Sequence, residues 1–194
     1  NSRDNEVYMD VAKKHNISFI LGEEKNVLGR LIKCGEHESA TDIFRITSEC
    51  PFLYFEAIKE TWSTYKDNNL DAIFMDHLID GIGFEIISLN ALKYSNEKGS
   101  EKHRSEFCSL FIRENINLFN VEKVIPPKYL IRHDLRLTVD NPEDLVICRR
   151  IYKEFENQAP KIKIKNIIDF LDTHKDLKKL VSPYLEEGYS TMYI

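Results

Sequence analysis

Two acidic residues stand where carboxylates could hold a metal ion. Glu49 follows the β-rich stretch 41–47, Asp140 follows the apolar run 135–139, and each precedes a proline that starts a predicted helix. In open α/β sheets, ligands bind beyond the carboxyl ends of the strands, so both side chains are predicted at one such edge. Two carboxylates there suit Mg²⁺, a hard cation that bridges to substrate phosphates. Helix capping is the alternative, and the spacing alone leaves both interpretations open.

Two other segments gather polar groups. The turn 80–85 places Glu85 inside an otherwise apolar run, where a buried carboxylate needs a partner. The segment 102–107 mixes basic and acidic residues at a predicted helix start. It could face a carboxylate-bearing sugar or form a solvated, ion-paired first turn.

Composition narrows the class of protein. The chain has 194 residues, 42% hydrophobic and 30% charged, which is typical of one globular domain or slightly more. Its net charge of −5 argues against nucleic-acid binding through a basic face. With no run of about 18 apolar residues and a polar beginning, we expect a cytoplasmic protein without a membrane span.

The chain offers no recognised metal or phosphate motif. Its four cysteines form no CxxC pair, and its six histidines form no HxxxH or HExxH spacing. Gly81 and Gly83 come closest to a phosphate loop but lack the Lys-Ser/Thr that such a loop requires. Nucleotide-binding residues therefore cannot be named from the sequence.

Strand and helix patterns alternate along much of the chain. They predict an α/β fold with a mostly parallel sheet and helices on both faces. Strands and helices stop alternating between about 75 and 131, which indicates a subdomain inserted into a core of residues 1–158. A helical extension is predicted over 159–194. The predicted strands are 17–21, 41–47, 70–75, 82–89, 121–125 and 136–139, and a long helix is predicted over 101–114.

Four segments resemble a known family. They are 26–30 (NVLGR), 45–51 (RITSECP), 80–85 (DGIGFE) and, most specifically, 136–145 (RLTVDNPEDL). Together they are similar to the spore-coat polysaccharide type of cytidylyltransferase, which is related to the enzymes that make CMP-activated nonulosonic and octulosonic acids. The segments occur in the family's order across residues 1–152.

The resemblance implies a glycosyltransferase-A-like nucleotidyltransferase fold and a Mg²⁺-dependent reaction of CTP with an acidic sugar, giving CMP-sugar and pyrophosphate for surface polysaccharide. It implies metal ligation by Asp140 and by the residue at the position of Glu49. It also implies a homodimer. On the sugar side it places Asp80, Gly81, Glu85, Arg104 and Arg136.

Two departures from the family pattern motivate an alternative function. Glu49 stands where the family has the aspartate of its Asp-Cys-Pro motif, and one extra methylene changes the Mg²⁺ geometry. The resemblance also begins after the family's first strand and its nucleotide-holding loop. The alternative is a truncated or degenerate domain that binds a sugar or a partner protein. A glycosyltransferase ranks lower still, since the expected strand end carries no Asp-x-Asp pair.

Overall fold

The structure is a computed structural model that describes residues 2–191. The chain divides into two compact units, one of Asn1–Ile43 and Ser88–Leu118 and one of Phe44–Ile87 and Phe119–Ile194. We call them unit 1 and unit 2. The predicted insertion over 75–131 and the predicted extension over 159–194 stay predictions.

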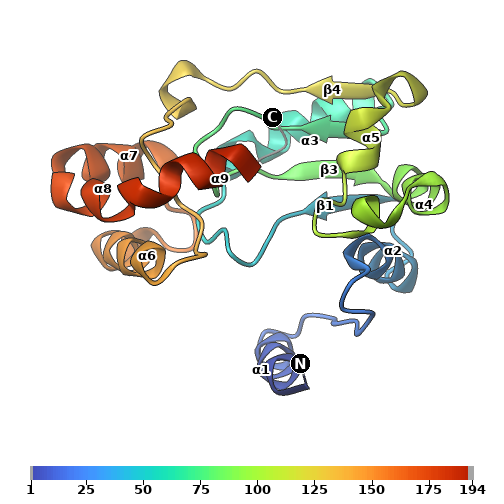
Figure 1. Ribbon diagram of the computed structural model, residues 1–194, viewed down its shortest axis with the longest axis horizontal. Helices are drawn as coiled ribbons and strands as arrows, with labels where there is room; N and C mark the ends of the chain where they lie inside the picture. The colour runs from blue at the N-terminus through green and yellow to red at the C-terminus, as the bar shows by residue number, and fades with distance from the viewer. Residues whose placement is uncertain (1, 192–194) are drawn as a thin grey trace. The chain divides into compact units, whose positions relative to one another are not determined.

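The four strands form one mixed sheet (Figure 1). Strand β2 (Ala72–Phe74) pairs antiparallel with β3 (Glu85–Ser88) and parallel with β4 (Val121–Lys123), and β1 (Asp42–Arg45) lies beyond β3. The prediction of a mostly parallel sheet is therefore wrong. The chain returns from β2 to β3 through the short segment 75–84, and a parallel neighbour would need a crossover of a dozen residues or more, usually a helix.

Two predicted strands do not form. Residues 17–21 have no regular structure, and Ile17 and Leu21 are 61% and 53% exposed. Residues 136–139 contribute only an isolated parallel bridge between Asp80 and Arg136. A strand needs a neighbour along its length, and these runs do not obtain one among the described residues.

The predicted helix over 101–114 is broken in two. A 3₁₀ turn, η2 (Glu101–Arg104), is followed by the short helix α5 (Leu110–Glu114). Between them the Ser105 hydroxyl donates to the carbonyl of Lys102 at 2.8 Å and accepts the N–H of Phe107 at 3.4 Å. A serine bonded to its own backbone in this way competes with helix hydrogen bonds.

Unit 1 contains α1 (Ser2–Lys14), α2 (Val27–His37), α4 (Leu89–Lys98), η2, α5 and η3 (Ile116–Leu118). The Asn26 side chain accepts the N–H of Gly29 at 2.8 Å and so caps the start of α2. Helix α2 packs against α4.

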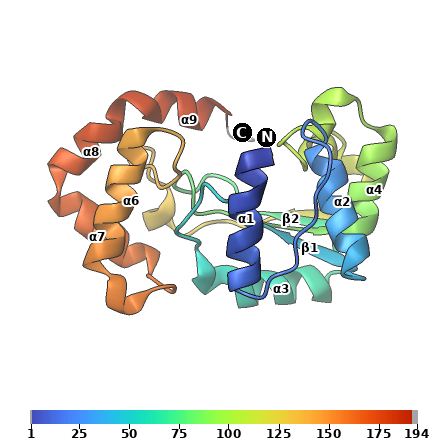
Figure 2. The same ribbon diagram turned by 90° about the horizontal axis from the view of Figure 1, so that it is seen from below.

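Unit 2 holds the larger core. Helix α3 (Ile58–Asp67), preceded by η1 (Phe55–Ala57), packs against β2. The C-terminal part forms α6 (Pro142–Glu154), α7 (Ile164–Thr173), α8 (Lys175–Val181) and α9 (Leu185–Thr191), with α6 and α7 packed against α8 (Figure 2). Three further 3₁₀ turns are η4 (Lys128–Leu130), η5 (Glu156–Gln158) and η6 (Ser182–Tyr184).

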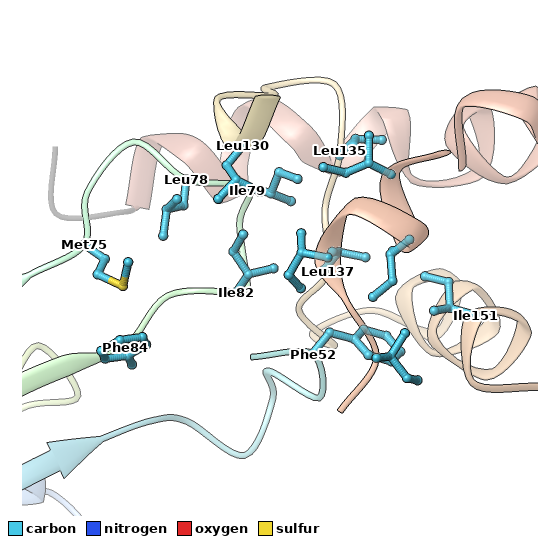
Figure 3. Close-up of a cluster of buried hydrophobic side chains, with 14 of the residues drawn as sticks. Phe52, Met75, Leu78, Ile79, Ile82, Phe84, Leu130, Leu135, Leu137 and Ile151 are labelled. Atoms are coloured by element: carbon cyan, nitrogen blue, oxygen red, sulfur yellow. The ribbon is translucent and has the colours of Figure 1, made fainter. Parts of the chain in front are cut away.

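The unit 2 core draws side chains from segments far apart in sequence. Phe52, Ile82, Leu137 and Ile151 are all buried in one cluster (Figure 3). Burying such side chains typically stabilises by about 1.5–3 kcal/mol each. This core fixes the loops on which the polar residues discussed next are placed. None of the described helices is long and apolar enough to cross a membrane.

Candidate functional site

The buried guanidinium of Arg136 is hydrogen-bonded to three carboxylates. The Arg136 side chain is 4% exposed. Its Nη1 donates to Asp80 Oδ2 at 2.7 Å, its Nε donates to Asp144 Oδ1 at 3.0 Å, and its Nη2 donates to Asp140. We call Arg136, Asp80, Asp140 and Asp144 the Arg136 cluster. Within this cluster three carboxylates surround one guanidinium.

Backbone contacts bring these residues together. The N–H of Leu137 donates to the carbonyl of Asp80 at 2.7 Å, next to the bridge between Asp80 and Arg136. Gly81 has φ +93°, and a Cβ there would lie 2.3 Å from the backbone nitrogen of Thr138. Only glycine accepts this conformation and this close approach. The structure therefore gives Gly81, predicted on the sugar side, a role in joining the two segments.

Asp144 hydrogen-bonds both to the backbone at the start of α6 and to Arg136. Its Oδ2 accepts the N–H groups of Asp140 at 3.0 Å and Asn141 at 2.9 Å, and Asn141 is the N-cap of α6. The Asp144 side chain is completely buried, so its charge depends on these donors and on Arg136. Asp144 thus orients Arg136.

Asp80 and Asp140 differ in their access to solvent. The Asp80 side chain is 15% exposed and that of Asp140 is 51% exposed. Burial raises the pKa of Asp80, Arg136 opposes that rise, and the neighbouring charges of Asp140 and Asp144 add to it. Asp140 is therefore the carboxylate of the cluster that can reach a ligand from solution.

The segment that contains Glu49 contacts the segment that carries Asp140. The Glu49 carbonyl accepts the N–H of Val139 at 2.9 Å, and its side chain lies on an exposed residue. The capping alternative is wrong for both acids: Asn141 is the N-cap of α6, and the first helical turn after Glu49 has Tyr54 as its N-cap. Metal ligation by Asp140 and Glu49 stays a prediction.

No group of three or more His, Cys, Asp or Glu side chains within residues 2–191 is arranged to hold a metal ion. Two carboxylates are nevertheless a donor set that Mg²⁺ accepts, because it commonly keeps several waters and takes its other ligands from substrate phosphates. Asp140 and Glu49 fit that pattern.

Glu85, predicted to need a partner, has one in Arg45. The Arg45 Nη1 donates to Glu85 Oε2 at 2.8 Å, with side chains 13% and 8% exposed. The two residues lie on the neighbouring strands β1 and β3. The need for a partner was readable from the sequence, but the partner itself depends on strand order.

Arg104 belongs to unit 1, whereas the other predicted sugar-side residues belong to unit 2. Its Nη2 donates to the carbonyls of Asn96 at 2.9 Å and Gly99 at 3.3 Å, at the end of α4. Nearby, Glu114 accepts from Lys102 at 2.7 Å and pairs with His103 at 2.9 Å. These contacts favour the ion-paired turn over the sugar-binding alternative for segment 102–107.

Two residues of this site, Tyr189 and Asp144, were not predicted from the sequence. The Tyr189 hydroxyl on α9 accepts the N–H of Asp80 at 3.2 Å and lies 2.8 Å from the carbonyl of Arg132. Burial raises the pKa of Tyr189 to about 12. Asp144 could have been found from its place three residues after Asn141, the spacing of a capping box. Nothing in the sequence pairs Tyr189 with residue 80.

The arrangement defines an α/β protein with a mixed sheet and a carboxylate-rich site formed by the loop after β2 and the start of α6. In fold it is similar to a cytidylyltransferase from Leptospira borgpetersenii, with a TM-score of 0.79 at 17% identity over 89% of this chain and 73% of that one. The predicted α/β class is confirmed.

The chain belongs to the cytidylyltransferase family, which it matches over residues 2–189. It is 29% identical to protein MJ1063 of Methanocaldococcus jannaschii, over 96% of this chain and 76% of that protein. It is 25% identical to the spore coat polysaccharide biosynthesis protein SpsF of Bacillus subtilis, over 84% of this chain and 68% of that protein. The predicted resemblance to the spore-coat type of cytidylyltransferase is confirmed.

Proposed function

We propose that this protein activates an acidic sugar of the nonulosonic or octulosonic class with CTP, releasing pyrophosphate. The observation that carries the proposal is the Arg136 cluster, in which Asp140 faces solvent and the neighbouring Val139 is bonded through its backbone to Glu49. Membership of the cytidylyltransferase family supports the use of CTP. The printed name of SpsF, which refers to polysaccharide biosynthesis, supports a sugar as the second substrate.

In the proposed reaction, a sugar hydroxyl oxygen bonds to the α-phosphorus of CTP as the bond to pyrophosphate breaks, and the hydroxyl proton passes to solvent. Positioning and charge neutralisation provide most of the catalysis in such transfers. Asp140 and Glu49 would hold Mg²⁺, which when bound neutralises phosphate charge. Arg136 fixes the Asp140 carboxylate, and Asp144 in turn fixes Arg136. Homodimer formation is a further part of the proposal.

The second candidate is a domain of the same fold that binds a sugar or a partner protein without catalysis. Glu49 favours it, because the longer side chain replaces the aspartate of the family motif that the sequence resembles. The two candidates differ in what they require of Asp140. Catalysis depends on its charge, whereas simple binding by the fold does not.

The test is pyrophosphate release by the full-length protein with CTP, Mg²⁺ and a panel of nonulosonic and octulosonic acids. We expect release with at least one acid and a loss of about 10²-fold or more in D140N, the range seen when one transition-state-stabilising group is removed. Asp67→Asn, an exposed acid at the end of α3, is the matched control. No release across the panel, or full activity in D140N, would favour the second candidate.

A further inference from the structure

The outward side of helix α6 carries exposed residues that the candidate site does not use. Helix α6 runs along the lower edge of the C-terminal helices in Figure 1. On its inward side it buries Asp144, Ile147, Cys148 and Ile151. Its exposed residues between 145 and 153 are three apolar and three basic ones, namely Leu145, Val146, Arg149, Arg150, Tyr152 and Lys153. We call these six residues the α6 outer face.

Helical geometry brings the six side chains to one side of α6. Residues three or four positions apart are neighbours on a helix surface, and Leu145, Arg149 and Lys153 have that spacing. Val146 and Tyr152 lie on the flanks of this row and are 49% and 51% exposed. Apolar and basic side chains therefore alternate across one solvent-facing surface.

The cations of the α6 outer face are not neutralised within the structure. Arg149 and Lys153 are four positions apart, a spacing at which like charges repel and destabilise a helix. Among the described residues, the side chains of Arg149, Arg150 and Lys153 have no ion-pair or hydrogen-bond partner. On α7, by contrast, Lys165 pairs with Asp169 four positions further on, as is common on solvated helices. An anionic partner would relieve the repulsion on α6.

The positive charge is a local property of this part of the chain. Residues 145–180 contain nine Lys or Arg and five Asp or Glu, whereas the whole chain has a net charge of −5. At physiological ionic strength, exposed charges more than about 8 Å apart are largely screened from each other. A partner at the α6 outer face therefore meets the local positive charge rather than the net negative one.

The apolar residues distinguish between anionic partners. Nucleic-acid phosphates are bound by cations and hydrogen-bond donors, and the side chains of Leu145 and Val146 are neither. At a bilayer surface, aliphatic side chains enter the acyl boundary, tyrosine lies at the level of the headgroups, and Lys or Arg attract anionic lipids. The α6 outer face presents all three kinds of side chain.

We propose that the α6 outer face docks the protein on an anionic lipid surface. Arg149, Arg150 and Lys153 contact the headgroups, and Leu145, Val146 and Tyr152 contact the acyl boundary. The docking is peripheral and reversible, because three cations supply only modest attraction to a membrane. None of the six residues belongs to the Arg136 cluster, so the inference does not depend on the proposed CTP reaction.

The experiment is co-sedimentation of the full-length protein with vesicles that contain phosphatidylglycerol and phosphatidylcholine, or phosphatidylcholine alone. We expect binding to the first kind, weakened by added salt, and none to the second. The double variant Arg149→Gln, Arg150→Gln should bind about 30-fold more weakly, the effect of two cations at an anionic surface. The matched control Lys59→Gln, Lys128→Gln removes two exposed cations of unit 2 outside α6 and should bind as the parent does.

Fluorescence tests the contact between the apolar residues and lipid. Trp62 on α3 is the only tryptophan of the chain, so the parent emission reports on a different helix. Vesicles with phosphatidylglycerol should shift the emission of Tyr152→Trp to shorter wavelength, because tryptophan at residue 152 leaves water for the bilayer interface. The parent emission should not change.

Three results would overturn the assignment. One is equal binding to both kinds of vesicle, or an equal loss in the Lys59 and Lys128 control. Another is vesicle binding without an emission shift in Tyr152→Trp. The third is release of the protein from vesicles by a polyglutamate peptide at a similar charge concentration, which would indicate an acidic protein partner instead. Both double variants alter exposed side chains and should unfold in urea at the parent midpoint.

Discussion

Gly188 on α9 lies against Arg136, so close that a Cβ on it would come within 2.2 Å of the guanidinium Nη1 and 2.8 Å of Asp80 Oδ2. Arg136 cannot move aside easily, because it is buried and bonded to three carboxylates. Helix α9 can therefore approach the cluster only with glycine at this position.

Gly188→Ala should destabilise the protein, although alanine is normally the better helix former. We expect a loss of about 1–3 kcal/mol from overpacking, measured by urea unfolding. Limited proteolysis should also cut α9 sooner. Gly83→Ala is the control, because its Cβ would meet nothing closer than 3.5 Å. Equal stability of both variants would show that α9 does not need this approach.

Arg136→Met should lower the free energy of unfolding much more than Asp140→Asn does. The first leaves the fully buried Asp144 carboxylate without its guanidinium, for which we expect a loss of about 3–5 kcal/mol in the free energy of unfolding. The second changes a half-exposed side chain and should cost at most about 1 kcal/mol. Urea denaturation of both variants measures the contrast, and a larger loss for Asp140→Asn would contradict the assignment of roles.

Acid should weaken a second ion cluster in unit 2. Arg132 donates to Asp134 at 2.7 Å and to Asp172 at 2.6 Å, and Lys178 bonds Asp134 as well. Hydrogen bonds from Arg132 hold the pKa of Asp134 and of Asp172 below the ordinary value of 3.8. A lowered pKa in the folded state gives stability that is present above pH 3.8 and is lost as the pH falls below it.

The double variant Asp134→Asn, Asp172→Asn should therefore lose less stability than the parent protein as the pH falls below about 4. Because these carboxylates are largely exposed, each should contribute only about 0.2–1 kcal/mol at neutral pH. Thermal unfolding between pH 3 and pH 7 measures the effect, and Asp67→Asn should follow the parent curve. Parallel curves for the double variant and the parent would refute the linkage.

Cys148 should resist alkylation in the folded protein. Burial, followed by the charge of Asp144, raises its pKa to about 12, so at pH 8 the group remains a thiol. Cys148 is 6% exposed and Cys108 is completely buried. We expect mass spectrometry after brief iodoacetamide treatment to find Cys148 and Cys108 unmodified in the native state and modified in urea. Rapid native labelling of Cys148 would contradict the burial of this face of α6.

The sequence places the Glu49 and Asp140 segments together correctly, although 136–139 is not a strand. The rule that ligands gather past apolar runs needs only that the runs end together, and the backbone bond from Val139 to Glu49 satisfies it. Strand direction was not readable in the same way. Strand β3 is antiparallel to β2 because of the way the chain turns between Met75 and Phe84. Hydrophobic periodicity predicts that a strand is present but not its direction.

The rest of the site depends on tertiary contacts between distant segments. Arg136 is close to Asp140 and Asp144 in sequence, but its partner Asp80 is 56 residues away and Tyr189 is 109 residues from Asp80. Arg45 meets Glu85 only because β1 and β3 are neighbours. Local patterns predict which side chains need partners, and the topology decides which partners they obtain.

The double use of Asp144 has an evolutionary consequence. Since one buried carboxylate secures both the start of α6 and the guanidinium of Arg136, the fold does not rely on the solvent-facing Asp140. A descendant of this protein that lost Asp140 would keep its architecture while losing the proposed metal ligand. Gene copies of this kind can therefore persist as stable binding proteins, and in this family an intact fold alone is a poor guide to whether a given member is an active enzyme.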